Sequence, residues 1–172
     1  MRIVVADAGP LIIFGKTCGI ELIRAVVEEI LVPPAVVSEC IDEAGKPGAI
    51  AIRQAIREGL LTVLEPAPVS GAACDLLLLD DGEKEALAAA HARHCAVLLD
   101  ETVARSVASK IGVQAIGSLG ILLKAKRLGA IAAIAPIIEE WKAANYFLGD
   151  RLVADVLRRA GETSVAQPGA SP

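Results

Sequence analysis

The sequence predicts an α/β fold, a three-layer α/β/α sandwich around a central and mainly parallel sheet. Short, continuous apolar runs alternate along the chain with longer segments whose apolar residues have helical spacing. Runs that are apolar throughout are typical of strands covered on both faces, and their alternation with helices indicates parallel pairing. The chain has 172 residues, of which 54% are hydrophobic but only 2% aromatic, so it can fill one aliphatic core.

Strands are expected where a short apolar run ends at a polar residue, a glycine or a proline. The first run ends at Asp7 and is followed by Gly9 and Pro10, which indicate a turn. A charge at the end of a buried run is costly unless it is paired or bound to a metal, so Asp7 needs an explanation. The predicted strands cover residues 2–7, 30–34, 60–66, 95–101 and 113–118.

Helix boundaries are indicated by proline and glycine and by acidic starts. Pro34 suits the first turn of a helix, Gly59 ends one, and the segment DDGEKEALAAA has the clearest helix start in the chain. The predicted helices cover residues 20–30, 34–45, 49–59, 80–94, 102–112, 119–129, 135–146 and 149–161. We expect one domain over residues 1–162 and a disordered tail over residues 163–172.

Composition and motifs exclude several classes of protein. No apolar stretch reaches the roughly 18 uncharged residues of a membrane span, and the N-terminus lacks the basic region of a signal peptide. We therefore expect a cytoplasmic protein. No glycine-rich phosphate loop occurs, which disfavours nucleotide hydrolases and dinucleotide-binding enzymes. The first half of the chain is acidic and the second half basic, a division compatible either with a metal centre beside a phosphate-binding face or with ordinary surface scatter of charge.

Acidic residues fall where a parallel sheet would bring them together. Asp7, Asp100 and Glu101 follow strands, and Glu39 and Glu83 lie near the starts of helices at the same edge of the sheet. Carboxylates at one edge repel each other unless they share protons or bind a cation, and oxygen ligands suit Mg²⁺ or Mn²⁺. A bound ion of this kind can activate water for phosphodiester cleavage. The five acids are thus the catalytic candidates, with Asp7, Asp100 and Glu101 as candidate metal ligands.

Each acid also has a structural explanation. Asp7 can accept hydrogen bonds from the backbone of the following turn. Glu83 can form a capping box with the aspartates before it, while Asp100 and Glu101 can cap the next helix. Glu39 can be a solvated acid on an amphipathic helix. The argument for a site therefore depends on the order and setting of all five residues together.

Several segments resemble PIN-domain proteins, in particular the DUF3368 type of PIN-like protein. They are ADAGPLI, VPPAVVSEC, DDGEKEALAAA, VLLDETVARSVASKIGVQAIGSLGILLKAKRLG and LRRAGE, and the resemblance covers roughly residues 3–162. It implies an α/β/α sandwich with an Mg²⁺- or Mn²⁺-dependent ribonuclease site. It also implies a toxin of a toxin–antitoxin pair, with RNA as substrate, an antitoxin protein as partner and a homodimer as assembly.

The resemblance carries over to the same acids, with two departures. By position, Asp7, Glu39 and Glu83 match three acids of the family, and Asp100 or Glu101 matches the fourth. Relatives often have two aspartates at the last place, so the Glu leaves the identity of the ligand open. Relatives also often have Ser or Thr just after the first aspartate, where this chain has Ala8 and then glycine.

The first hypothesis is a metal-dependent endoribonuclease that leaves a 3′-hydroxyl and a 5′-phosphate. Basic residues of the second half, Arg105 and Lys124 among them, are candidates for contacts with the phosphates, and Ser118 can position water or phosphate or cap a helix. The alternatives are a module that binds nucleic acid or a protein partner without cutting, and a metal-dependent phosphatase. The high apolarity of residues 119–138 favours a homodimer.

Overall fold

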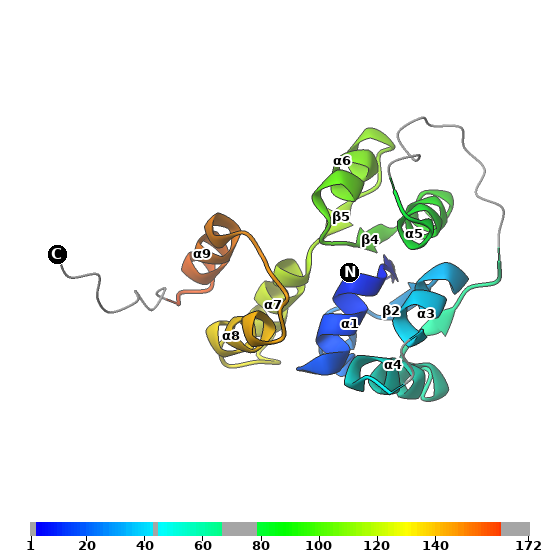
Figure 1. Cartoon of the computed structure of the whole chain (residues 1–172). Helices are drawn as coiled ribbons and strands as arrows, with labels where there is room; N and C mark the ends of the chain where they lie inside the picture. The colour runs from blue at the N-terminus through cyan, green and yellow to red at the C-terminus, as the bar shows by residue number, and fades with distance from the viewer. Residues whose placement is uncertain (1–2, 43–44, 67–78, 163–172) are drawn as a thin grey trace.

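A parallel sheet forms the centre of the molecule (Figure 1). The computed structural model describes residues 3–42, 45–66 and 79–162. Within these residues, five strands pair in the order β3-β2-β1-β4-β5, and every pairing is parallel. The predicted α/β/α sandwich with a parallel sheet is confirmed. The strands are β1 (Ile3–Ala6), β2 (Glu29–Val32), β3 (Thr62–Val63), β4 (Ala96–Leu98) and β5 (Ala115–Ile116).

Helices connect successive strands and continue after the last one. Figure 1 shows α7, α8 and α9 on one side of α1, and α3, α4 and α5 on the other. The helices are α1 (Ala8–Lys16), α2 (Glu21–Arg24), α3 (Pro34–Ile41), α4 (Pro47–Arg57), α5 (Asp81–Ala92), α6 (Thr102–Lys110), α7 (Ser118–Arg127), α8 (Ala135–Ala143) and α9 (Asp150–Arg159). Among the described residues, none of these helices has the length and apolarity that a membrane crossing requires.

The central strands are buried as their apolar sequences predict. In β1, Val4, Val5 and Ala6 are completely shielded from solvent, and α5 packs against both β1 and β4. Burial of each large aliphatic side chain contributes about 1.5–3 kcal/mol relative to exposure. The continuous apolar run at the start of the chain is therefore the middle of the core, with Asp7 at its end.

Two local predictions are wrong. Gly9 and Pro10 do not form a turn but lie in the first turn of α1, where a proline costs no helical hydrogen bond because its N–H would have no partner there. The helix predicted over residues 20–30 is only the four residues of α2, because Glu29 already begins β2. Pairing of β2 with β1 and β3 outweighs the helical spacing of that segment.

The order of the strands places Asp7 at a topological switch point of the sheet. After β1 the chain adds β2 and β3 on one side of it, and later adds β4 and β5 on the other side. The order of the strands therefore reverses between β1 and β4, although all strands are parallel. The N–H of Asp7 donates to the carbonyl of Leu98 at 3.0 Å, which ties the ends of these two strands together. In open α/β sheets, ligands bind at such a reversal, beyond the carboxyl ends of the strands.

The C-terminal helices pack onto the same body. Trp141 of α8 is fully buried against Phe14 of α1, with ring centroids 5.2 Å apart. Glu162, the last described residue, accepts hydrogen bonds at the start of α8. The extent of the domain over residues 1–162 stays a prediction, and the tail predicted over residues 163–172 lies outside the described residues.

Candidate active site

Asp7 is a buried acid between the end of β1 and the start of α1. It is only 8% exposed and begins α1, but its side chain makes no capping hydrogen bond. Burial raises the pKa of Asp7 to about 7; the N–H of Ala8 acts in the opposite direction, and the charges of Glu39 and Glu83 raise it further. The backbone N–H of Ala8 stabilises the charged form of Asp7, but this is outweighed by the effect of burial.

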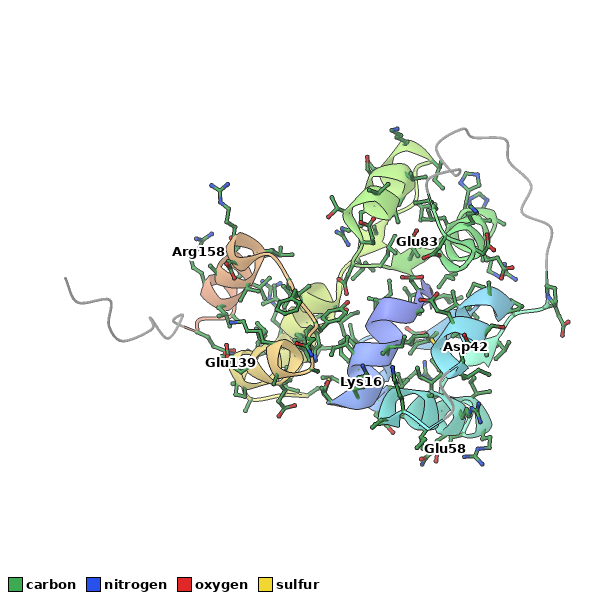
Figure 2. All side chains as sticks on the ribbon, in the orientation of Figure 1. Lys16, Asp42, Glu58, Glu83, Glu139 and Arg158 are labelled. Carbon is green, nitrogen blue, oxygen red and sulfur yellow. The ribbon has the colours of Figure 1, made fainter. Side chains whose placement is uncertain are left out.

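Glu83 lies at the start of α5, facing Asp7. It is 8% exposed and forms a capping box with Asp80: the Glu83 N–H donates to Asp80 Oδ1 at 2.8 Å, and the Asp80 N–H donates to Glu83 Oε2 at 3.1 Å. Burial raises the pKa of Glu83, and the charges of Asp80, Glu101 and Glu39 add to the effect. Figure 2 shows Glu83 on α5 beside β4. Glu83 can cap α5 and still act beside Asp7, because the capping box occupies only its Oε2.

Glu39 extends from α3 to the same place. Its side chain is exposed, but a Cβ added to Gly82 in the first turn of α5 would lie 3.0 Å from Glu39 Oε2 and 3.4 Å from Asp80 Oδ1. Glycine at this position therefore allows the Glu39 carboxylate to approach the backbone of α5. Loss of hydration at the carboxylate raises the pKa of Glu39, and the charge of Asp80 raises it further.

Asp100 follows β4 and is held by three donors. The N–H of Ser118 donates to Oδ1 at 2.8 Å, the Ser118 hydroxyl donates to Oδ2 at 2.5 Å, and the Tyr146 hydroxyl also donates to Oδ2. A Cβ on Gly117 would lie 3.0 Å from Asp100 Oδ1 and 3.4 Å from Arg105 Nη1. Asp100 is thus fixed at the start of α7, beside a guanidinium.

Ser118 and Glu101 have structural roles that the sequence left open. Ser118 is completely buried and its hydroxyl is engaged by Asp100, so it orients this carboxylate and has no exposed atom for substrate. Glu101 is exposed and caps α6 by accepting the N–H of Ala104 at 2.9 Å. Its charge still raises the pKa of Glu83.

The structure brings three of the five predicted acids together and holds Asp100 separately, with Ser118 and Tyr146. One cluster lies between β1 and the start of α5 and contains Asp7, Glu39, Glu83 and also Asp80. Asp100 lies beyond its donor, the Tyr146 hydroxyl. A Cβ added to Gly9 would be 3.8 Å from that hydroxyl and 4.0 Å from Asp7 Oδ2.

Among the described residues, no three acidic, histidine or cysteine side chains are arranged to enclose a metal ion. The donors nevertheless suit a hard cation, because all are carboxylate oxygens and Asp7 is buried among like charges. Mg²⁺ in particular is usually held by one or two carboxylates and keeps several waters, so it does not require a closed cage. The residues present fit such an ion at Asp7.

A basic groove opens from Asp100 between α6, α7 and α9. It has a volume of about 520 Å³, with four cations along an apolar floor. Arg105 also donates to the carbonyl of Leu99 at 2.7 Å, so its position is fixed. The residues that define the basic groove by charge are Arg105, Lys124, Arg127 and Arg159.

Sequence reasoning missed three of these features. Asp80 was seen only as a helix cap, and Tyr146 carried no motif at all. Arg159 of α9 lies far along the chain from the other groove residues. A capping-box pattern beside a predicted acid was the available signal for Asp80, whereas Tyr146 and Arg159 depend on how α8 and α9 pack.

A family model of the PIN domain, DUF3368, matches residues 3–162. The chain belongs to the PIN-domain family. PIN domains are generally nucleases and generally use divalent metal ions, in agreement with the chemistry of the acids around Asp7.

Among solved structures, a PilT N-terminus domain protein from the hyperthermophilic archaeon Sulfolobus solfataricus P2 is similar, with a TM-score of 0.46 and 18% sequence identity. The match covers 71% of this PIN-domain chain and 91% of that chain. Comparison with curated proteins gives no match.

Proposed function

We propose that this PIN domain is a metal-dependent endoribonuclease. The observation that carries the proposal is Asp7, a carboxylate buried among other acids at the point between β1 and β4 where the strand order reverses. A buried acid among like charges is unfavourable for folding unless it has a partner, and such acids cluster at functional sites. Binding of a divalent cation would offset the repulsion, and PIN domains generally use such ions.

The proposed roles follow from the position of each acid. Asp7 holds Mg²⁺ or Mn²⁺. Asp100 is better placed than Glu101 to assist, since the Tyr146 hydroxyl that donates to Asp100 lies beside Gly9, close to Asp7, while Glu101 caps α6. Glu39 and Glu83 orient water at the edge of the site through hydrogen bonds. When bound, the ion would supply Lewis acidity, lowering the pKa of a water and stabilising charge on the phosphodiester.

The basic groove supports RNA as the substrate. Its four cations begin beside Asp100 and continue along α7 to α9, so a strand whose phosphates lie in the groove ends beside Asp100. Phosphate contacts of this kind bind the backbone without reading sequence. Few aromatic side chains are available, which favours backbone contacts over base stacking.

Cleavage of a labelled single-stranded RNA in Mn²⁺ or Mg²⁺ tests the proposal. Asp7→Asn keeps the size of the side chain but removes the charge, and we expect at least about a 100-fold loss of rate because several kcal/mol of stabilisation disappear. Glu139→Gln is the matched control, since Glu139 lies exposed on α8, away from the acids (Figure 2). Equal cleavage by the wild type and Asp7→Asn would reject the nuclease and point to a contaminant.

A second candidate function is binding without cleavage, to RNA or to a protein partner. It is favoured by Glu101, which caps a helix in place of an aspartate, and by Ala8, which offers no hydroxyl. In that case the wild type and Asp7→Asn would bind the same RNA with equal affinity, and neither would cut it. A role as a toxin with an antitoxin partner stays a prediction, which a small neighbouring reading frame in the genome would support.

A further inference from the structure

The hydroxyl of Tyr146 lies inside the candidate active site, although this residue follows α8. It donates a hydrogen bond to Asp100 Oδ2, across 46 residues of sequence. The absence of a side chain at Gly9 leaves room for it: an added Cβ there would lie 3.8 Å from the Tyr146 hydroxyl and 4.0 Å from Asp7 Oδ2. The phenol thus meets the metal-binding candidates from the C-terminal part of the chain.

The ring of Tyr146 is held in place by a row of aromatic contacts. It packs edge-on against Trp141, with centroids 5.7 Å apart and planes at 77°, and Trp141 packs in the same way on Phe14 of α1. Trp141 Nε1 donates to the Thr17 hydroxyl at 3.0 Å. The backbone N–H of Tyr146 donates to the carbonyl of Trp141 at 2.8 Å. The hydroxyl therefore approaches Asp100 from a rigid support.

The three hydrogen bonds on Asp100 are unevenly shared between its two oxygens. Oδ2 accepts from both the Ser118 and Tyr146 hydroxyls, whereas the single donor to Oδ1 among the described residues is the N–H of Ser118. A carboxylate has about four acceptor positions, two on each oxygen. Oδ2 is therefore saturated, and Oδ1 keeps one position for a further partner.

We propose that Tyr146 is a positioning residue of the active site, which with Ser118 fixes Asp100 so that Oδ1 remains available to the divalent ion. This inference rests on the proposed function. Hydrogen-bond donors behind a metal ligand fix its orientation, and their removal typically lowers metal affinity about 10- to 100-fold. Tyr146 then links the packing of α8 to metal affinity.

The test measures Mn²⁺ affinity and thermal stability of the full chain. In Tyr146→Phe the ring stays and only the hydroxyl is lost, so we expect Mn²⁺ binding, followed by electron paramagnetic resonance of the free ion, to weaken about 10-fold. Thr17→Val is the matched control: it removes the partner of Trp141 in the same cluster without touching Asp100. It should lower the Tm and leave Mn²⁺ affinity unchanged.

Ser118→Ala provides a second variant that acts on the same oxygen. It should weaken Mn²⁺ binding in the same direction, and the effects of the two changes should not add, because both hydroxyls bond to Oδ2. If Tyr146→Phe and Thr17→Val lose stability alike and both bind Mn²⁺ as the wild type does, Tyr146 is only structural and the inference is wrong. If the wild type binds Mn²⁺ no better than Asp7→Asn, the proposed function itself fails, and the inference with it.

Discussion

At the scale of single residues, Asp7 combines a structural cost with a proposed function. Its carboxylate lies in a buried site beside Glu39 and Glu83, and burial together with these charges raises its pKa to about 7. A neutral residue of the same shape would suit the metal-free fold better. Natural active sites commonly contain such residues, whose replacement increases stability while it removes function.

We therefore predict that Asp7→Asn stabilises the metal-free protein. In EDTA at pH 8 the variant should have a higher Tm than the wild type, by roughly 2–4 °C for each kcal/mol of repulsion removed. Differential scanning calorimetry measures this, with Glu139→Gln as a control that should leave the Tm unchanged because Glu139 is exposed. A lower Tm for Asp7→Asn would mean that the carboxylate has a stabilising partner.

The positions of the acids could be predicted from sequence because each follows from a local pattern. Asp7 and Asp100 end apolar runs, and Glu83 belongs to a recognisable helix start. The hydrogen-bond partners of each acid could not be predicted from the sequence. Glu101 and Asp100 are neighbours in sequence, yet one caps α6 and the other faces Ser118 and Tyr146.

At the scale of elements, the first N–H groups of two helices, α3 and α8, donate to a glutamate from a distant part of the chain. Glu85 of α5 accepts the N–H of Ala35 at 3.0 Å, at the start of α3. Glu162 accepts the N–H groups of Ile134 and Ala135 at 2.7 and 2.8 Å, at the start of α8. Such acids satisfy free N–H groups and favour the positive end of the helix dipole.

Glu162 should make the stability of the protein depend on pH. Burial by itself would raise its pKa, but the hydrogen bond from Lys126 and those from the two backbone N–H groups outweigh this, so the pKa is lowered below the ordinary 4.5. A lowered pKa means that the stabilisation is complete above about pH 4.5 and disappears as the pH falls through the folded-state value.

We predict that Glu162→Gln lowers the Tm at pH 7, where hydrogen bonds to a charged group contribute about 1.5–3 kcal/mol, and that the difference from the wild type shrinks below pH 4.5. Thermal unfolding followed by circular dichroism at pH 7 and pH 3.5 measures it. A difference that stays constant across this range would show that the charge of Glu162 is not involved.

The predictions of secondary structure were wrong where contacts in the folded protein outweigh the preferences of the local sequence. Gly9 and Pro10 look like a turn in sequence, yet they form the first turn of α1. Residues 20–30 have helical spacing, but Ile30 and Leu31 are needed in the sheet. Propensity and spacing are weak where a short segment must pair with a central strand.

At the scale of the whole molecule, the acids of the first half and the cations of the second half gather in different places. The acids gather around Asp7, and the basic groove extends away from Asp100. The sequence predicted this division of charge, but not that α9 contributes to the groove. The apolar stretch over residues 119–138 supplies core residues of the monomer, including Ile121, Leu122 and Ile138. The homodimer thus stays a prediction, which light scattering at two concentrations tests.

Replacing cations of the basic groove should weaken RNA binding without unfolding the protein. For Lys124→Gln and Arg127→Gln in the Asp7→Asn background, fluorescence anisotropy with a labelled single-stranded RNA should show lower affinity. Each lost phosphate contact should reduce the slope of log affinity against log salt by about 0.7. Lys142→Gln is the control, since Lys142 lies on α8 outside the groove and pairs with Glu139. Equal affinity of all variants would place RNA elsewhere.

The most direct test of the central claim is a crystal of the wild-type protein soaked in Mn²⁺ and measured at a wavelength where manganese scatters anomalously. The account predicts an anomalous peak within coordination distance of an Asp7 oxygen, about 2.2 Å, and no such peak in Asp7→Asn. A strong peak elsewhere with none at Asp7, or the same peak in the variant, would contradict it.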